Sequence, residues 1–174
     1  SKPGPIGPIS WTEKTLKYAV SIMSPSKVYI GFPGYGRDWI TSIQGKCPVS
    51  APPGLIGGAK AATFKTSYAL TKAAIDKATP VFDEKFGEAT YSYSQIYNGL
   101  SATGASTECT VNRTVWYQND RSYAERMALV AKYRLGGAAL WTLAMESPEA
   151  TSELRKAALA IAPDPVVSNL SIEG

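Results

Sequence analysis

The sequence contains no histidine, which excludes several kinds of active site at once. Ser-His-Asp triads, Cys-His nucleophile pairs and histidine-ligated metal centres all need an imidazole. Any chemistry therefore falls to carboxylates, tyrosine, arginine or lysine. We expect neither a metal ion nor a cofactor.

Long apolar runs and clusters of positive charge are also missing. No stretch approaches the roughly 20 apolar residues that a membrane-spanning helix requires, and no signal peptide opens the chain. The net charge is +4, but lysine and arginine are scattered along the sequence. We therefore expect one soluble, domain-sized core with neither a membrane nor a nucleic acid as partner.

Cysteine is scarce, with only Cys47 and Cys109 in the chain. Their surroundings, Gly-Lys-Cys-Pro and Thr-Glu-Cys-Thr, are typical of loops. An even pair in exposed segments favours one disulfide bond and an extracellular setting, and two free thiols are the alternative.

The segment from Lys27 to Trp39 carries the strongest local signal. It begins as a continuous apolar run, typical of a strand covered on both faces, and Gly31, Pro33, Gly34 and Gly36 then predict a loop. That loop carries Tyr35, Arg37, Asp38 and Trp39. Because α/β folds bind ligands just past the carboxyl ends of parallel strands, we predict a binding site here. The alternative is a surface turn with Trp39 packed on the core.

Apolar periodicity and capping patterns predict the remaining organisation. Helices are expected over 11–23 and 121–133, with capping boxes at Ser10–Glu13 and Ser122–Glu125, and a last helix begins at Ser147 and Pro148. A second buried strand is expected over 138–143, so that a helix–strand unit occurs twice, as in a parallel α/β repeat.

The middle of the chain has short alternating segments between loops rich in proline and glycine, and this pattern indicates an inserted α+β module. We expect a strand over 61–65, a helix over 67–77, a hairpin of 80–82 and 89–93, and a strand over 110–117. The predicted division is therefore 1–39 with 114–162, an insertion of 40–113, and a linker of 163–174.

Four segments, taken in order, resemble the C-terminal part of glycoside hydrolase family 18. They are Lys27–Trp39, Ala89–Leu100, Thr114–Ser122 and Leu135–Glu146. That family contains chitinases, endo-β-N-acetylglucosaminidases and spore-cortex peptidoglycan hydrolases. In the third segment Asn119 and Asp120 stand where an acidic pair is common, and we expect them to be helix-cap and loop residues.

The resemblance implies an α/β fold in which the last two βα units of a (β/α)8 barrel carry a chitinase-type insertion. The family's Asp-x-x-Asp-x-Asp-x-Glu motif, whose glutamate is the proton donor, and its Met-x-Tyr-Asp motif are not found in the sequence. We therefore expect a fragment or one part of a split enzyme. Strand residues Val28, Ile30, Ala139 and Leu140 would then need the missing N-terminal barrel portion, or another copy of the chain, as partner.

The resemblance also implies hydrolysis of β-1,4 bonds in glycans that contain N-acetylglucosamine, such as chitin or peptidoglycan. In this family the acetamido group of the substrate is the nucleophile, and retention of configuration follows. The catalytic acid lies outside this sequence, so the chain would supply substrate-binding residues only. The candidates are Trp141 for stacking on a pyranose ring, Tyr35, Arg37 and Trp39 near the cleft, and Tyr91 from the insertion.

Each of these candidates also has a structural alternative. Trp141 could be an ordinary core tryptophan, and Tyr91, Tyr93 and Tyr97 could pack the insertion's own core. At the level of the whole protein, the alternatives are a non-catalytic chitinase-like lectin and a structural or interaction domain. A polysaccharide substrate and the expected disulfide both favour an extracellular or cell-wall location.

Overall fold

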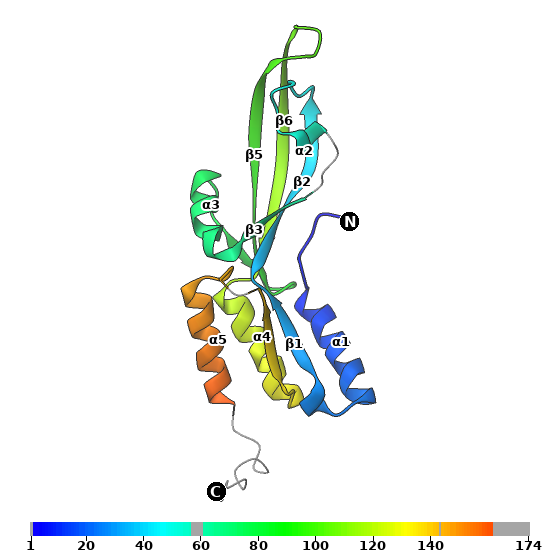
Figure 1. Cartoon of the computed structure of the whole chain (residues 1–174), viewed down its shortest axis with the longest axis vertical. Helices are drawn as coiled ribbons and strands as arrows, with labels where there is room; N and C mark the ends of the chain where they lie inside the picture. The colour runs from blue at the N-terminus through cyan, green and yellow to red at the C-terminus, as the bar shows by residue number, and fades with distance from the viewer. Residues whose placement is uncertain (1, 57–60, 143, 162–174) are drawn as a thin grey trace, which may run out of the picture.

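The computed structural model describes residues 2–56, 61–142 and 144–161 and forms two sheets, one beyond the other (Figure 1). The first sheet contains β1 (Tyr29–Pro33) and β7 (Gly137–Trp141), with helices α1 (Ile9–Ile22), α4 (Asp120–Tyr133) and α5 (Pro148–Ala160). The second is antiparallel and includes the long arm of β2, β5 and β6 at the top of Figure 1.

The first sheet is parallel, as predicted, and it is covered on one face only. Ile30 and Phe32 are buried in a core that includes Tyr123, Met127 and Val130 of α4. The opposite face is bare among the described residues, where Tyr29 is 61% exposed and Trp141 72% exposed. The expectation of strands covered on both faces is therefore wrong, and Ala139, predicted to be buried, is exposed.

Helix positions agree with the apolar periodicity, but the two predicted capping boxes, at Ser10 and Ser122, are wrong. Helix α1 begins at Ile9 after Pro8 and has no side-chain cap, so Ser10 lies within the helix, and Glu13 accepts hydrogen bonds from Lys132 and Tyr133. Helix α4 is capped by Asn119, whose side chain accepts from the Ser122 amide at 3.0 Å. The expected caps Asn119 and Ser147 are therefore confirmed, whereas Asp120 is the first residue of α4 and not a loop residue.

The buried face of α4 also differs from the apolar stripe of Ala124, Met127, Ala128 and Ala131 that helical spacing predicts. Met127 is buried as expected, but Ala128 and Ala131 are exposed. Their predicted place is taken by Tyr123 and Val130, together with the fully buried Arg126. A buried arginine in this position cannot be recognised from apolar periodicity alone.

The second sheet has the strand order β3-β2-β6-β5-β4. Its strands are β2 (Tyr35–Gly45), β3 (Ala61–Lys65), β4 (Val81–Asp83), β5 (Glu88–Leu100) and β6 (Ser106–Tyr117). The short helical segments are η1 (Pro25–Lys27), α2 (Pro53–Ile56), η2 (Thr66–Tyr68) and α3 (Ala69–Ile75).

The segment Tyr35–Trp39 is therefore not a loop, which corrects the prediction made from its glycines. Residues 35–39 pair with Ala61–Lys65 of β3, and from Arg37 onward β2 also pairs with β6. Gly36 fits this strand because the Phe64 ring lies where its side chain would stand. Cross-strand hydrogen bonds outweigh the low strand propensity of glycine here.

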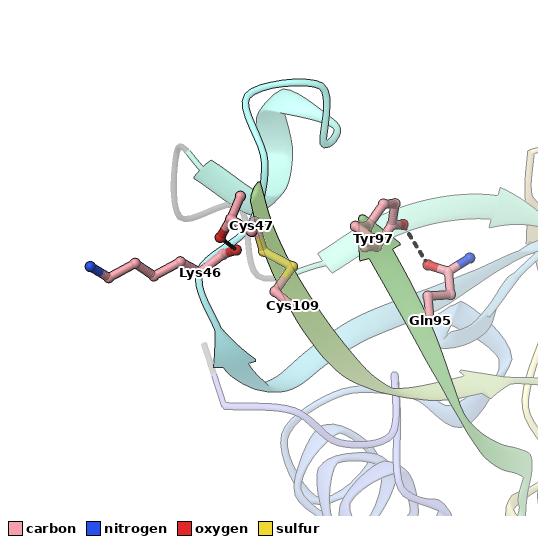
Figure 2. The surroundings of a disulfide bond; sticks show 6 residues. Lys46, Cys47, Gln95, Tyr97 and Cys109 are labelled. Carbon is pink, nitrogen blue, oxygen red and sulfur yellow. Dashed lines mark hydrogen bonds between the residues drawn. A yellow bond between two sulfur atoms is a disulfide. The ribbon is translucent and has the colours of Figure 1, made fainter. Parts of the chain in front are cut away.

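The predicted disulfide between Cys47 and Cys109 is present (Figure 2). It ties the loop after β2 to β6, beside a small core of Ala51, Leu55 and Val111. Strands β5 and β6 extend well beyond the predicted hairpin and form the tip of the arm (Figure 1). The 62-residue separation between the cysteines spans most of the second sheet.

Some expectations fall outside the described residues. These are the end of the predicted strand at Leu143 and the tail over 163–174. Within the described ranges, no helix has the length and apolar character needed to cross a membrane. The same residues hold no group of three or more acidic or cysteine side chains arranged as metal ligands.

Candidate substrate-binding site

The site lies where the two parallel strands end. Pro33 of β1 is aligned with Trp141 of β7, so both strands present their carboxyl ends together. The Gly34 amide donates to the Trp141 carbonyl oxygen at 2.6 Å, and the Gly34 carbonyl accepts from the Thr66 amide at 3.0 Å. Tyr35 follows directly, so Tyr35 and Trp141 lie at the same rim.

A groove of about 380 Å³ runs along β1 to this rim. Its lining comes from the N-terminal segment, α1, β1, the start of β2, Gln118, α4 and β7. Aromatic and polar side chains line it, among them Trp11, Tyr29, Tyr35, Gln118, Arg126 and Trp141. The exposed Trp141 indole offers a flat apolar surface of the kind that packs against the C–H face of a sugar.

Arg37 and Trp39 lie on the same face of β2 as Tyr35, because side chains alternate along a strand. The Arg37 guanidinium lies over the Tyr35 ring at 5.2 Å from its centroid and donates to the Thr63 hydroxyl at 2.8 Å. The Trp39 indole N–H donates to the Gly4 carbonyl oxygen at 3.0 Å. Arg37 is thus held beside the groove, whereas Trp39 fastens the N-terminal segment.

Tyr91 lies on the opposite face of the sheet, under α3. It is only 4% exposed, and its hydroxyl donates to Asp76 at 2.9 Å. The structure therefore does not bring Tyr91 together with Tyr35 and Arg37. This position favours the packing alternative that the sequence left open.

The buried face around Tyr91 contains a dense network of charged groups. Asp38 pairs with Lys72 and with Arg113, each at 2.9 Å, and Tyr93 donates to Asp38 at 2.6 Å. Burial and the hydrogen bond to Asp38 raise the pKa of Tyr93 to about 12. Burial alone lowers the pKa of Lys72, but hydrogen bonds to Asp76 and Asp38 outweigh it and raise that pKa. The network joins α3 to the back of the sheet.

A second buried network was missed by sequence reasoning and lies below the groove. Glu88 is fully buried and accepts from the Ile6 and Gly7 amides, each at 2.8 Å. Gln118 donates to the same carboxylate at 3.1 Å, and the Arg126 guanidinium lies 3.4 Å from it. No local sequence signal distinguishes Glu88 from an exposed strand-end glutamate. Within the described residues this network fastens the N-terminal segment to both sheets.

Comparison with models of known protein families shows to which family the chain belongs. The model of the family described as "Glycosyl hydrolases family 18" matches residues 2–146, which is most of the chain. The chain belongs to glycosyl hydrolase family 18. The match includes both parallel strands, the antiparallel sheet and the rim that carries Tyr35 and Trp141.

Individual family 18 relatives are much longer than this chain. The cortical fragment-lytic enzyme of Bacillus cereus is 26% identical over 146 residues, which cover 83% of this chain and 28% of that enzyme. A chitinase structure from Chromobacterium violaceum is 28% identical, with a TM-score of 0.66, and covers 91% of this chain and 41% of its own. The spore cortex-lytic enzyme SleL of Bacillus megaterium shares the fold, with a TM-score of 0.65 at 23% identity over 89% of this chain and 31% of its own. Across the curated relatives that it matches, the chain spans 28% to 38% of their length.

Proposed function

We propose that this chain is the C-terminal part of a family 18 glycosidase that hydrolyses β-1,4 bonds in chitin or peptidoglycan. In this proposal residues 1–39 and 114–162 belong to a (β/α)8 barrel, 40–113 form the insertion, and 163–174 are a linker. Membership of the family and the two parallel strands with their helices support it. The known disulfide is in keeping with a secreted or cell-wall location.

The observation that carries the proposal is the exposed indole of Trp141 beside Tyr35 at one rim of the groove. A pyranose ring stacked on Trp141 would place its hydroxyl and acetamido groups near the Tyr35 hydroxyl and the Arg37 guanidinium, which are hydrogen-bonding groups. The chain's own residues would thus bind and orient the N-acetylglucosamine unit. Trp39 takes part less directly, through its bond to Gly4.

Bond cleavage in this proposal needs a group that the sequence does not contain. The acetamido oxygen of the sugar forms a bond to its anomeric carbon while the glycosidic bond breaks, and a carboxylic acid protonates the leaving oxygen. The Asp-x-x-Asp-x-Asp-x-Glu motif that supplies this acid in the family is absent from the 174 residues. The chain by itself would therefore bind glycan without cleaving it.

The bare face of the parallel sheet defines the partner that completes the site. Tyr29, Ala139 and Trp141 are exposed on that face, and each of the two strands is paired on one edge only within the described residues. Free strand edges and bare aromatic side chains fit further parallel strands. We assign this role to the N-terminal barrel portion that longer relatives possess, with another copy of the chain as the alternative.

Binding of N-acetylglucosamine oligomers, measured by isothermal titration calorimetry, tests the proposed role of Trp141 in sugar binding. The wild-type chain should show saturable binding, and Trp141→Ala should weaken it about fivefold or more, since one lost stacking contact is worth roughly 1 kcal/mol or more. Tyr18→Ala is the matched control, because Tyr18 is 67% exposed on α1 and lies outside the groove lining. Equal affinity of Trp141→Ala and wild type would refute the role of Trp141.

Turnover of a fluorogenic N-acetylglucosamine oligomer tests whether the chain binds glycan without cleaving it. We expect none from the purified chain, and measurable hydrolysis would show that the acid lies within it. The alternative function is a non-catalytic chitinase-like lectin, which the exposed Trp141 also supports. An intact acidic motif in the N-terminal barrel portion distinguishes an enzyme from a lectin.

A further inference from the structure

The outer edge of β5 has no strand beside it for most of its length. Strand β4 pairs with β5 at residues 88–90 only, and β6 occupies the other side throughout. Among the described residues, the one further backbone bond to this edge runs from the Val49 amide to the Leu100 carbonyl oxygen. The stretch from Tyr91 to Gly99 therefore presents unpaired donors and acceptors, which form a template for another strand.

The other edges of this sheet carry features that hinder such pairing. Strand β3 is five residues long and ends at Lys65, and β4 has three residues, follows Pro80 and contains Asp83. Strand β2 lies inside the sheet, but its part beyond β3 follows a register shift between Ile40 and Ser42. Short length, charge, proline and bulges are the usual means of protecting an edge.

The β5 edge has none of these protections. No charged residue and no proline occurs between Glu88 and Glu108, which is a long interval even for a chain in which 18% of the residues are charged. The ladder from β5 to β6 is also regular, without a register shift. An edge of this length and neutrality resembles an interaction surface more than a solvent-exposed margin.

We propose that this edge pairs with the same edge of a second copy, antiparallel about a two-fold axis at Gln95. The free stretch 91–99 is centred on Gln95, because β4 blocks one end and the bond from Val49 closes the other. Two identical patches can meet in this way, since a two-fold interface is self-complementary. The proposal is independent of the proposed function, because it involves neither the groove nor the parallel sheet.

The amino-acid pattern suits this register. Centring on Gln95 places Tyr93 opposite the partner's Tyr97, and Ser92 opposite the partner's Asn98. Aromatic side chains then face each other across the new strand pair, as do hydrogen-bonding polar ones, and both arrangements stabilise antiparallel sheets. No like charges meet, although the whole chain has a net charge of +4. A neutral edge offers no electrostatic attraction to an acidic or basic partner, and this favours a second copy of the same neutral edge.

Sedimentation of the full chain over about 10 μM to about 1 mM tests the proposal, because dimerisation depends on protein concentration. We expect a monomer–dimer equilibrium in the wild type. Gln95→Lys, which sets two like charges against each other at the axis, should raise the dissociation constant at least tenfold. Thr110→Lys is the matched control, because it adds the same charge on the neighbouring strand β6, opposite Ile96 and away from the edge.

A mixture of Gln95→Lys and Gln95→Glu chains keeps the test decisive if either variant is damaged. Opposite charges then meet at the axis, so the mixture should form heterodimers while each variant alone stays monomeric. A monomer at every concentration would overturn the proposal, as would a dimer that Gln95→Lys leaves intact. A dimer broken by Tyr29→Lys alone would also overturn it, and would assign association to the parallel sheet.

Discussion

At the scale of single residues, Glu88 joins parts of the chain that are distant in sequence. Its carboxylate accepts from the amides of Ile6 and Gly7 and from Gln118, and it lies beside the Arg126 guanidinium. Burial lowers the pKa of Arg126, and the nearby Glu88 charge opposes that effect. A buried ion pair adds little net stability, because both charges lose their hydration. Removing one partner costs much more, because it leaves the other charge buried without a counter-charge.

We therefore expect Glu88→Gln to lower the free energy of unfolding by about 3 kcal/mol, since it leaves Arg126 buried without its nearest counter-charge. Urea denaturation followed by circular dichroism measures the change. Glu84→Gln is the control, because Glu84 pairs with Arg121 at a side-chain exposure of 72%. That surface pair should contribute about 1 kcal/mol or less, and equal losses in the two variants would contradict the argument.

At the scale of elements, the sequence predicted the positions of the helices and the parallel strand pair better than it predicted where strands begin and end. Apolar spacing located α1, α4 and α5, and two helix–strand units correctly indicated a parallel pair. Tyr35–Trp39 was predicted as a loop because its glycines have low strand propensity. Pairing with β3 and β6, which are distant in sequence, determines its actual structure and has no local signature.

The candidate site was predictable to the same degree. The position of Trp141 and Tyr35 at one rim follows from parallel strands of equal length, which local patterns indicate. The burial of Tyr91 against Asp76 depends on which face α3 covers, and alternation along β5 leaves that choice open. The Glu88 network depends on three distant segments and could not be predicted.

The contact of α3 with the sheet should weaken in alkali. The pKa of Tyr93 is raised to about 12, so the folded chain keeps a proton that the unfolded chain releases near pH 10. This contribution is complete below pH 10 and is lost as the pH rises through about 12. After allowance for partial exposure, we expect a loss of about 1 to 2 kcal/mol.

Tyr93→Phe removes this proton and isolates its effect. The variant should be less stable at neutral pH, because the bond to Asp38 is lost, but its stability should fall less between pH 10 and 12. Thermal melts over that range measure both slopes. Tyr117 and Tyr123, whose pKa values burial also raises to about 12, are common to both proteins and cancel in the difference. Equal slopes would count against the assignment.

At the scale of the whole molecule, the disulfide restricts the unfolded chain more than it shapes the folded one. Closing a loop of 62 residues removes conformational entropy worth about 4 kcal/mol in the chain-entropy model, and measured values are commonly about 2 to 4 kcal/mol. We expect reduction of the disulfide to lower the free energy of unfolding by about 2 to 4 kcal/mol, measured by urea denaturation with and without reductant. The double variant Cys47→Ala/Cys109→Ala should be as unstable as the reduced wild type and should not change on addition of reductant. A change in that variant would show that the reductant does not act through the disulfide.

The junction at Gly34 has a mechanical consequence for the protein as a whole. One residue separates β1 from β2, its amide is bonded to Trp141 and its carbonyl to Thr66. The arm and the parallel sheet are therefore joined by a single residue that is hydrogen-bonded on both sides. A force applied to the tip of the hairpin would be transmitted through Gly34 to the backbone of Trp141, at the rim of the groove.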